Sequence, residues 1–215
     1  LAVIAVLIYI IYTIIKLIRC GGRLKRLYAA VINLLAAGLA VYAGFCMLWG
    51  VYYYGDDFMT RSGLKNDIIS VEQLETVTEY FAALVNEYSS QVPRDADGNY
   101  IADRAAILSR SNEVYANVEE TLPCLSGPAV RAKGVYFSRV MSYTDFTGFF
   151  FPFTAEANVN TDFPPALFAS TVAHELAHQR GVAKEQEANF AAVLASLEYG
   201  DAEYCYSACV LAYTH

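Results

Sequence analysis

The sequence lacks the features of several common protein classes. Basic side chains are outnumbered, with 15 Lys and Arg against 22 Asp and Glu, and the formal net charge is −7. An acidic chain has no general attraction for phosphate backbones, so we expect no nucleic-acid partner. The five cysteines form neither a CxxC metal pattern nor a disulfide framework. Internal repeats and low-complexity tracts are also lacking.

Charged residues are nearly missing from two long stretches at the start of the chain. Residues 1–18 carry one charge, Lys16, and residues 29–54 carry none. About 20 mainly apolar residues span a bilayer, so we predict two transmembrane helices within residues 1–55. The chain opens inside the first stretch, which we interpret as a span cut short at its start. A signal-peptide core is the alternative for residues 1–18, but no small-residue cleavage pattern follows it.

The loop between the two stretches is basic, because Arg19, Arg23, Lys25 and Arg26 lie close together. Short loops rich in Lys and Arg stay on the cytoplasmic side of a membrane. We therefore predict a multi-pass protein of the cell (cytoplasmic) membrane whose residues 56–215 form an extracytoplasmic domain.

Aromatic residues gather where the second apolar stretch ends. Trp49, Tyr52, Tyr53 and Tyr54 are typical of the belt that aromatic side chains form at the outer membrane interface. They could also belong to the core of the domain that follows. The sequence leaves both interpretations open.

Residues 56–215 are sufficient for one domain with a core of its own. Ser70 and Gln73 have the spacing of a capping box, and the apolar periodicity after them predicts a helix. Residues 103–123 favour a second helix, and residues 148–160 favour a strand, a turn and a strand. The fold class expected is α+β, mainly helical with a small β-sheet. The last helix has no closing signal, so we expect the domain to be truncated at its C-terminus.

The stretch HELAH, residues 174–178, carries the strongest chemical signal. His174 and His178 are four residues apart and share one face of a helix, where two imidazoles can bind one Zn²⁺ ion. Glu175 is positioned to act as the general base toward a zinc-activated water. The alternative is a pair of ordinary histidines on an amphipathic helix.

A zinc ion needs a third protein ligand, and the residues after HELAH offer candidates. Lys184 stands where a third histidine would follow, and a lysine is no ligand at neutral pH. Glu185 can serve instead, with Asn189 one turn later hydrogen-bonded to a ligand histidine. Glu187 is about half a turn away from Glu185, so we expect only one of them to bind. Both could also be a solvated acidic first turn of the next helix.

Several segments in order between Trp49 and Ser196 carry a family resemblance. They read YYYGDDF, SVEQLE, FSRVMSYTDFTGFFFPFTAEANVN, PPALFASTVAHELAHQRG and EQEANF. They resemble the bacterial membrane proteins of domain-of-unknown-function family 3810, and the EQEAN ending is similar to glutamate-zincin families. The resemblance implies a zincin-like metallopeptidase domain with His174, His178 and Glu185 as metal ligands and Glu175 as the base.

The segment FTAEANVN stands where zincins often place an edge strand that pairs with an extended substrate. Strand addition supplies backbone hydrogen bonds without demands on sequence. Glu156, Asn158 and Asn160 could line that cleft, or the segment could be a plain hairpin. An oxyanion also needs a hydrogen-bond donor, and the candidates are Tyr143, Tyr199 and Tyr204.

These observations predict a membrane-anchored, zinc-dependent metallopeptidase that hydrolyses peptide bonds of a peptide or protein substrate. The alternative is a non-catalytic, membrane-tethered module that keeps the zincin scaffold for binding. An intramembrane protease is excluded, because the apolar run before HELAH has only ten residues.

Overall fold

The computed structural model describes residues 2–19, 23–65 and 67–214. The chain divides into two compact units, Leu1–Leu48 and Trp49–His215. The boundary precedes the aromatic cluster that we expected at the membrane interface. Trp49 packs against Phe150 at a ring-centroid distance of 5.1 Å, so this residue belongs to the second unit. Tyr54 is exposed.

The first unit consists of the helices α1, Ala2–Arg19, and α2, Arg23–Leu48. Among the described residues, one helix is long and apolar enough to cross a membrane, and it covers Leu24–Leu48. A helix of 18 residues such as α1 rises roughly 27 Å, slightly less than the hydrocarbon core of a bilayer. The described chain therefore supports one of the two predicted spans. By length and composition, α2 could be a membrane anchor or a signal sequence.

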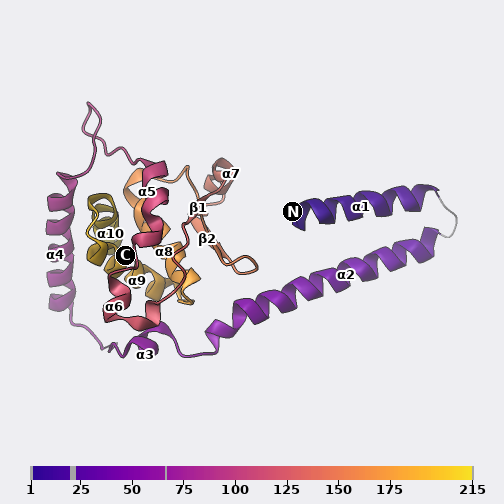
Figure 1. Cartoon of the computed structure of the whole chain (residues 1–215), viewed down its shortest axis with the longest axis horizontal. Coiled ribbons are helices and arrows are strands. Elements are labelled where there is room, and N and C mark those ends of the chain that lie inside the picture. The colour runs from indigo at the N-terminus through magenta and orange to yellow at the C-terminus, as the bar shows by residue number, and fades with distance from the viewer. Residues whose placement is uncertain (1, 20–22, 66, 215) are drawn as a thin grey trace. The chain divides into compact units, whose positions relative to one another are not determined.

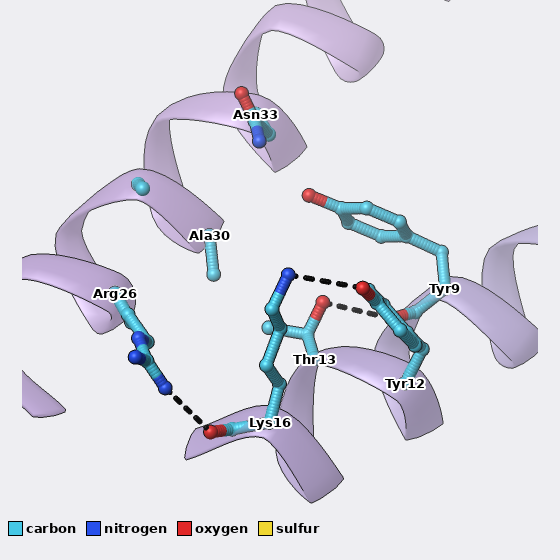
Figure 2. Close-up of a pocket in the computed structure, with 8 residues that line it drawn as sticks. Tyr9, Tyr12, Thr13, Lys16, Arg26, Ala30 and Asn33 are labelled. Atoms are coloured by element: carbon cyan, nitrogen blue, oxygen red, sulfur yellow. Dashed lines mark hydrogen bonds between the residues drawn. The ribbon is translucent and has the colours of Figure 1, made fainter. Parts of the chain in front are cut away.

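Polar side chains line a cavity of about 270 Å³ between α1 and α2 (Figure 2). Lys16 Nζ donates to the Tyr12 hydroxyl at 3.0 Å, and Arg26 donates to the Lys16 carbonyl at 3.1 Å. The predicted orientation also depended on Arg19 and Arg23, whose side chains lie outside the described part of the chain, as does Cys20.

The second unit is mainly helical with one small sheet, as expected for an α+β domain. Its elements are η1 Gly50–Tyr53, α3 Phe58–Ser62, α4 Val71–Ser89, α5 Arg104–Arg110, η2 Ser111–Glu113, α6 Val118–Thr121, η3 Pro123–Leu125, β1 Lys133–Gly134, α7 Ser138–Ser142, β2 Gly148–Phe151, β3 Glu156–Val159, α8 Pro165–Gln179, α9 Glu185–Tyr199 and α10 Ala202–Thr214. α10 packs against α4 on one side and against α8 and α9 on the other (Figure 1).

The two helices predicted before the sheet have different outcomes. The helix after Ser70 is confirmed: the Ser70 and Gln73 side chains each accept a hydrogen bond from the other residue's backbone N–H. The helix predicted over residues 103–123 is wrong, because it is broken into α5, η2 and α6. At the break the Ser111 hydroxyl donates to the Leu108 carbonyl and accepts from the Ala132 N–H. Such side-chain bonds compete with a continuous helical ladder.

The sheet has the strand order β1-β3-β2, with β3 parallel to β1 and antiparallel to β2. The predicted strand, turn and strand are therefore confirmed as the β2–β3 hairpin, and Pro152 lies in its turn. Among the described strands β2 is an edge of the sheet. Both β2 and β3 pack against α8, which places this edge beside the helix that carries HELAH.

Small residues allow the helices that carry the site to approach closely. The buried positions of α8 and α9 are rich in alanine, including Ala173, Ala177, Ala188 and Ala192, all with 0% exposed surface. Side chains of this size let two helix backbones come nearer than leucine or phenylalanine would. Groups at the end of α8 and the start of α9 are therefore brought within reach of one another.

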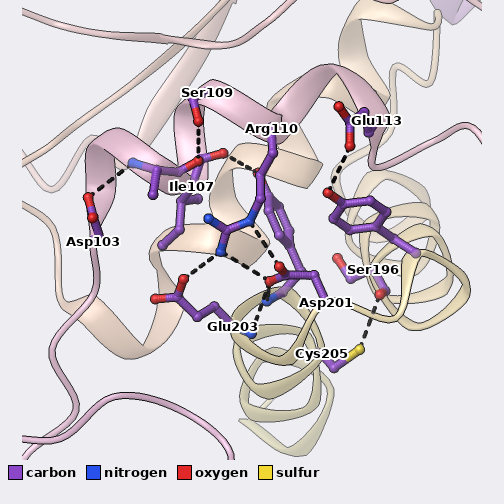
Figure 3. Close-up of polar contacts among 12 residues, drawn as sticks. Asp103, Ile107, Ser109, Arg110, Glu113, Ser196, Asp201, Glu203 and Cys205 are labelled. Atoms are coloured by element: carbon purple, nitrogen blue, oxygen red, sulfur yellow. Dashed lines mark hydrogen bonds and ion pairs between the residues drawn. The ribbon is translucent and has the colours of Figure 1, made fainter.

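An ion cluster ties α5 to the start of α10 (Figure 3). Arg110 Nε lies 2.9 Å from Asp201 Oδ2, and its guanidinium also pairs with Glu203 at 2.5 Å. The Tyr100 hydroxyl donates to the other Glu203 oxygen at 2.9 Å. Because these groups are only partly exposed, removing Arg110 would leave two carboxylates short of their partner.

We expect Arg110→Leu to lower the free energy of unfolding by about 2 kcal/mol, since a fully buried pair would lose more and an exposed pair less. The full-length protein in detergent should then unfold at a temperature several degrees lower, as followed by circular dichroism. Arg139→Leu is the matched control, because Arg139 is exposed on α7. Equal melting temperatures for the two variants would contradict a stabilising role for the cluster.

Candidate metal centre

The end of α8 turns the chain back so that the next helix starts near HELAH. Gly181 adopts a left-handed conformation with φ of 79°. Its N–H bonds to the His178 carbonyl at 3.0 Å, and the Val182 N–H bonds to the Ala177 carbonyl at 3.1 Å. This pair of bonds is a Schellman motif, which closes the helix and favours glycine at the left-handed position. α9 then begins at Glu185.

Three side chains converge at this turn. His174 Nε2 lies 3.1 Å from Glu185 Oε2, and His178 Nε2 lies 3.6 Å from Glu185 Oε1. One ligand atom from each of the three residues lies within 4.8 Å of the others. Three atoms bound tetrahedrally to zinc at about 2.1 Å would be roughly 3.4 Å apart. The spacing and the donor types, two imidazoles and one carboxylate, therefore fit a zinc ion.

Hydrogen bonds orient both imidazoles toward Glu185. His174 Nδ1 lies 2.7 Å from Asn189 Oδ1, and His178 Nδ1 lies 2.7 Å from the Val182 carbonyl oxygen. A carbonyl can only accept, so His178 carries its hydrogen on Nδ1. The Nε2 lone pair of the neutral ring is then free to bind a metal, which is the usual arrangement of metal-binding histidines.

The two acidic residues at the start of α9 lie in different surroundings. The neighbouring His174 and His178 side chains hold the pKa of the Glu185 carboxyl well below its ordinary value. Glu187 is buried and accepts the Phe58 N–H at 3.0 Å. The geometry therefore selects Glu185 as the third candidate ligand and assigns Glu187 to packing against α3.

Glu175 is buried beside the three candidate ligands, with 3% of its surface exposed. Burial raises the pKa of its carboxyl to about 7. Within the described chain, its Oε2 is a buried side-chain oxygen that lacks a hydrogen-bond partner. A buried polar atom without a partner costs free energy, and a bound ion or a catalytic role is among the reasons for which proteins retain one. A carboxylate with this pKa can both accept and release a proton near neutral pH.

Three cavities lie around this cluster. The first, about 340 Å³, is lined by residues 145–150 and by Trp49 and Tyr53. The side chains of His174, Glu175, His178 and Glu185 complete its lining. The second, about 240 Å³, also contains His174 and Glu185 and continues toward Leu167. The third, about 480 Å³, is almost wholly apolar and shares Asn189 with the second. The cluster is thus reached from a cavity that borders the edge strand β2.

The three residues that the sequence suggested for a substrate cleft do not lie beside the cluster. Glu156 and Asn158 lie on β3, the central strand, where Glu156 pairs with Lys133. Asn160 is fully buried and donates to the Phe146 carbonyl at 3.0 Å. None of the three lines the described cavities beside the cluster. The sequence showed a hairpin but not which of its strands would be the edge, and that strand is β2.

The tyrosines suggested as oxyanion donors do not line these cavities either. Tyr143 is exposed, Tyr199 donates to Glu113, and Tyr204 is buried with its hydroxyl on the Ile107 carbonyl. Tyr53 does line the first cavity, and its hydroxyl donates to the Ala183 carbonyl at 3.1 Å. Arg180, which follows HELAH closely in the chain, is buried and forms an ion pair with Glu119.

A family model described as "Protein of unknown function (DUF3810)" matches residues 1–215. The chain belongs to the DUF3810 family. This membership confirms the family resemblance drawn from residues 49–196 and extends it over both units. Neither a curated protein nor a solved structure matches the chain.

Gly148 is a site residue that sequence reasoning missed. A Cβ atom at this position would lie 2.5 Å from Glu175 Oε1 and 2.8 Å from its Cδ. Real Cβ atoms do not approach a carboxyl group so closely, so only glycine leaves room for Glu175. Nothing in the sequence marks this glycine, because its partner is on a helix far along the chain.

We expect Gly148→Ala in this DUF3810 protein to displace the Glu175 carboxylate while leaving the candidate metal ligands in place. If Glu175 acts in catalysis, hydrolysis should fall by about 100-fold, since misplacement by 1 Å has effects of this size. Zinc content should remain that of the wild type. Gly55→Ala is the control, because a Cβ there meets only a backbone oxygen at 3.9 Å. Unchanged activity in Gly148→Ala would contradict a role for the position of Glu175.

Proposed function

We propose that this protein is a membrane-anchored, zinc-dependent metallopeptidase of the glutamate-zincin type. The observation that carries the proposal is the convergence of His174, His178 and Glu185 within 4.8 Å, with both imidazoles oriented by hydrogen bonds on Nδ1. Three protein ligands would leave a fourth position open, as catalytic zinc sites do.

The residues of the chain supply the remaining chemistry. When bound, a zinc ion supplies a Lewis acid for a carbonyl oxygen and lowers the pKa of water. Glu175, with its pKa near neutrality, accepts a proton from the attacking water and delivers it to the leaving amine. His174 and His178 stay oriented by Asn189 and the Val182 carbonyl throughout.

The edge strand β2 supports a polypeptide as the substrate. Residues 147–150 border the cavity that holds His174 and Glu175, and β2 has no second described strand partner. An extended peptide could add to this edge through backbone hydrogen bonds and pass its scissile bond over the cluster. The aromatic side chains of Phe149 and Phe150 would then favour apolar residues in the substrate.

For the location, we propose the cell membrane with Trp49–His215 on the extracytoplasmic side. The apolar helix Leu24–Leu48 would be the anchor, with α1 as a second span and the basic residues Lys25 and Arg26 on the cytoplasmic side. The alternative is a non-catalytic module that binds peptides on the same scaffold. The buried, unpaired carboxylate of Glu175 argues against it, because binding alone has no need of that group.

Metal analysis of the full-length protein in detergent tests the proposal. We expect about one zinc per chain and cleavage of a quenched-fluorescent peptide library. Chelation by 1,10-phenanthroline should abolish cleavage, and added Zn²⁺ should restore it. Absence of zinc after metal-replete expression would reject the metal centre. Zinc without cleavage of any peptide would favour the binding module.

A further inference from the structure

The residues that directly follow α2 form one side of the candidate metal centre. The Trp49 ring lies edge-on to the His178 ring, with centroids 5.5 Å apart and an interplanar angle of 86°. Trp49 and Tyr53 both line the cavity that contains Glu175 and Glu185. The site therefore includes the first residues after the apolar helix. The HExxH residues and Glu185 would not by themselves require these aromatic neighbours.

The same stretch is fixed to the turn between His178 and Glu185. The Tyr53 hydroxyl donates to the Ala183 carbonyl at 3.1 Å. The Tyr52 ring occupies the space beside Gly181, where a Cβ would lie 2.7 Å from Tyr52 Cε1. Both contacts hold the turn that sets the distance between the second histidine and the carboxylate.

α3 continues this attachment. Asp57 forms an ion pair with Lys184, the Phe58 N–H donates to Glu187, and Arg61 donates to the Gly181 carbonyl at 3.3 Å. Residues 49–61, called here the docked segment, thus contact the end of α8, the turn after it and the start of α9 at several points between Trp49 and Arg61. A segment with so many fixed contacts is not a flexible linker.

This attachment limits how far the site can be from the apolar helix. Trp49 follows Leu48, the last residue of that helix, without any intervening residue. With 3.8 Å between consecutive Cα atoms and one side chain's reach, His178 lies within roughly 15 Å of the end of the helix for any orientation of the two units. The headgroup layer on one side of a bilayer is about 5–8 Å thick.

We infer that the docked segment holds the metal centre at the bilayer surface, so that its substrates are membrane-proximal segments of polypeptides. This inference rests on the proposed function. The surroundings of the cluster agree with it: Trp49, Phe149 and Phe150 line the apolar part of the first cavity, and the apolar third cavity lies beyond Asn189. Tryptophan and tyrosine side chains such as Trp49 and Tyr53 are enriched at membrane–water interfaces.

Trp49 is the only tryptophan in the chain, so its fluorescence reports on both parts of the inference. The full-length protein is reconstituted into phosphatidylcholine vesicles. Co²⁺ added as the metal should quench Trp49, because the ring lies 5.5 Å from His178. Lipids brominated near the headgroup should quench the same fluorophore. Quenching by Co²⁺ but not by lipid would overturn the surface location, whereas no quenching by Co²⁺ would overturn the metal centre itself.

A matched pair of insertions distinguishes quenching of Trp49 by lipid at the bilayer surface from quenching that reflects only a solvent-exposed ring. A rigid helical spacer of about 20 residues, roughly 30 Å long, is placed between Leu48 and Trp49. We expect it to remove quenching by lipid and to retain quenching by Co²⁺, which also shows that the domain is folded. The same spacer at Gly98, an exposed turn, should retain both. Lipid quenching that survives the first insertion would overturn the inference.

The substrate class is tested with a peptide that the wild type cleaves in solution. The peptide is fused to a transmembrane helix in the same vesicles, either directly or through the rigid spacer. Wild type should cleave the direct fusion at least 10-fold faster, and the Leu48–Trp49 insertion variant should reverse this preference. Equal rates for both fusions with both proteins would overturn the preference for membrane-proximal segments. Failure to cleave the peptide in solution would instead overturn the proposed function.

Discussion

Replacing Glu175 by glutamine should lower peptide hydrolysis by about 1000-fold, within the range that a positioned general base contributes. Glutamine has the shape of glutamate, but it cannot accept a proton from water. The side chain is 3% exposed, so the neutral amide also removes the cost of burying a carboxylate. We therefore expect Glu175→Gln to keep its zinc and to unfold at a temperature no lower than that of the wild type. Turnover, zinc content and melting temperature are measured on the same preparation.

Glu156→Gln is the matched control for this substitution. Glu156 pairs with Lys133 on the surface of the sheet, outside the described cavities beside the cluster. Its loss should leave hydrolysis within a factor of about two, because an exposed ion pair contributes little. Full activity in Glu175→Gln would reject the mechanism while leaving the metal centre intact. Activity lost together with zinc would mean that Glu175 holds the site together and is not the base.

Removing the carboxylate of Glu185 should lower zinc affinity by more than 100-fold, since loss of an outer hydrogen-bond partner alone lowers it 10–100-fold. Glu185→Ala leaves only two imidazoles for the ion. The pKa of Glu185 is depressed by both histidines, so this carboxylate is ionised and ready to bind at neutral pH. Competition with a chromogenic chelator measures the affinity, and hydrolysis should be lost with the metal.

Glu187→Ala distinguishes metal binding by one carboxylate from a general effect of negative charge at the start of α9. Glu187 lies on the same first turn but accepts the Phe58 N–H, away from both imidazoles. We expect this variant to keep its zinc and to be less stable, because a buried N–H loses its partner. Zinc lost in Glu187→Ala but kept in Glu185→Ala would contradict the assignment of the third ligand.

Much of the site follows from short-range rules that the sequence obeys. His174 and His178 share a face because of the helical period, and Gly181 ends the helix because it tolerates positive φ. Glu185 and Asn189 are then separated by one turn of the next helix. The structure brings these four side chains together, with Asn189 on His174 as the spacing predicted. The capping box at Ser70 and the hairpin of residues 148–160 are local in the same sense.

Other features depended on residues far apart in the chain. Gly148 matters only because β2 lies against the Glu175 side chain, and the edge of the sheet is β2 because β1 pairs with the other side of β3. Ser111 breaks the predicted helix through a bond to the Ala132 N–H. Each of these contacts joins segments that no periodicity relates, so the sequence could not reveal them.

The sequence by itself determined the helical, acidic domain, the apolar helix before it and the pattern of two histidines with a downstream carboxylate. These depend on local periodicity, which a single chain displays directly. Tertiary packing decided which strand borders the cluster, which glycine makes room for Glu175 and that Trp49 packs on His178. Burial of these groups follows from close packing of distant segments, and close packing is a property of the folded chain alone.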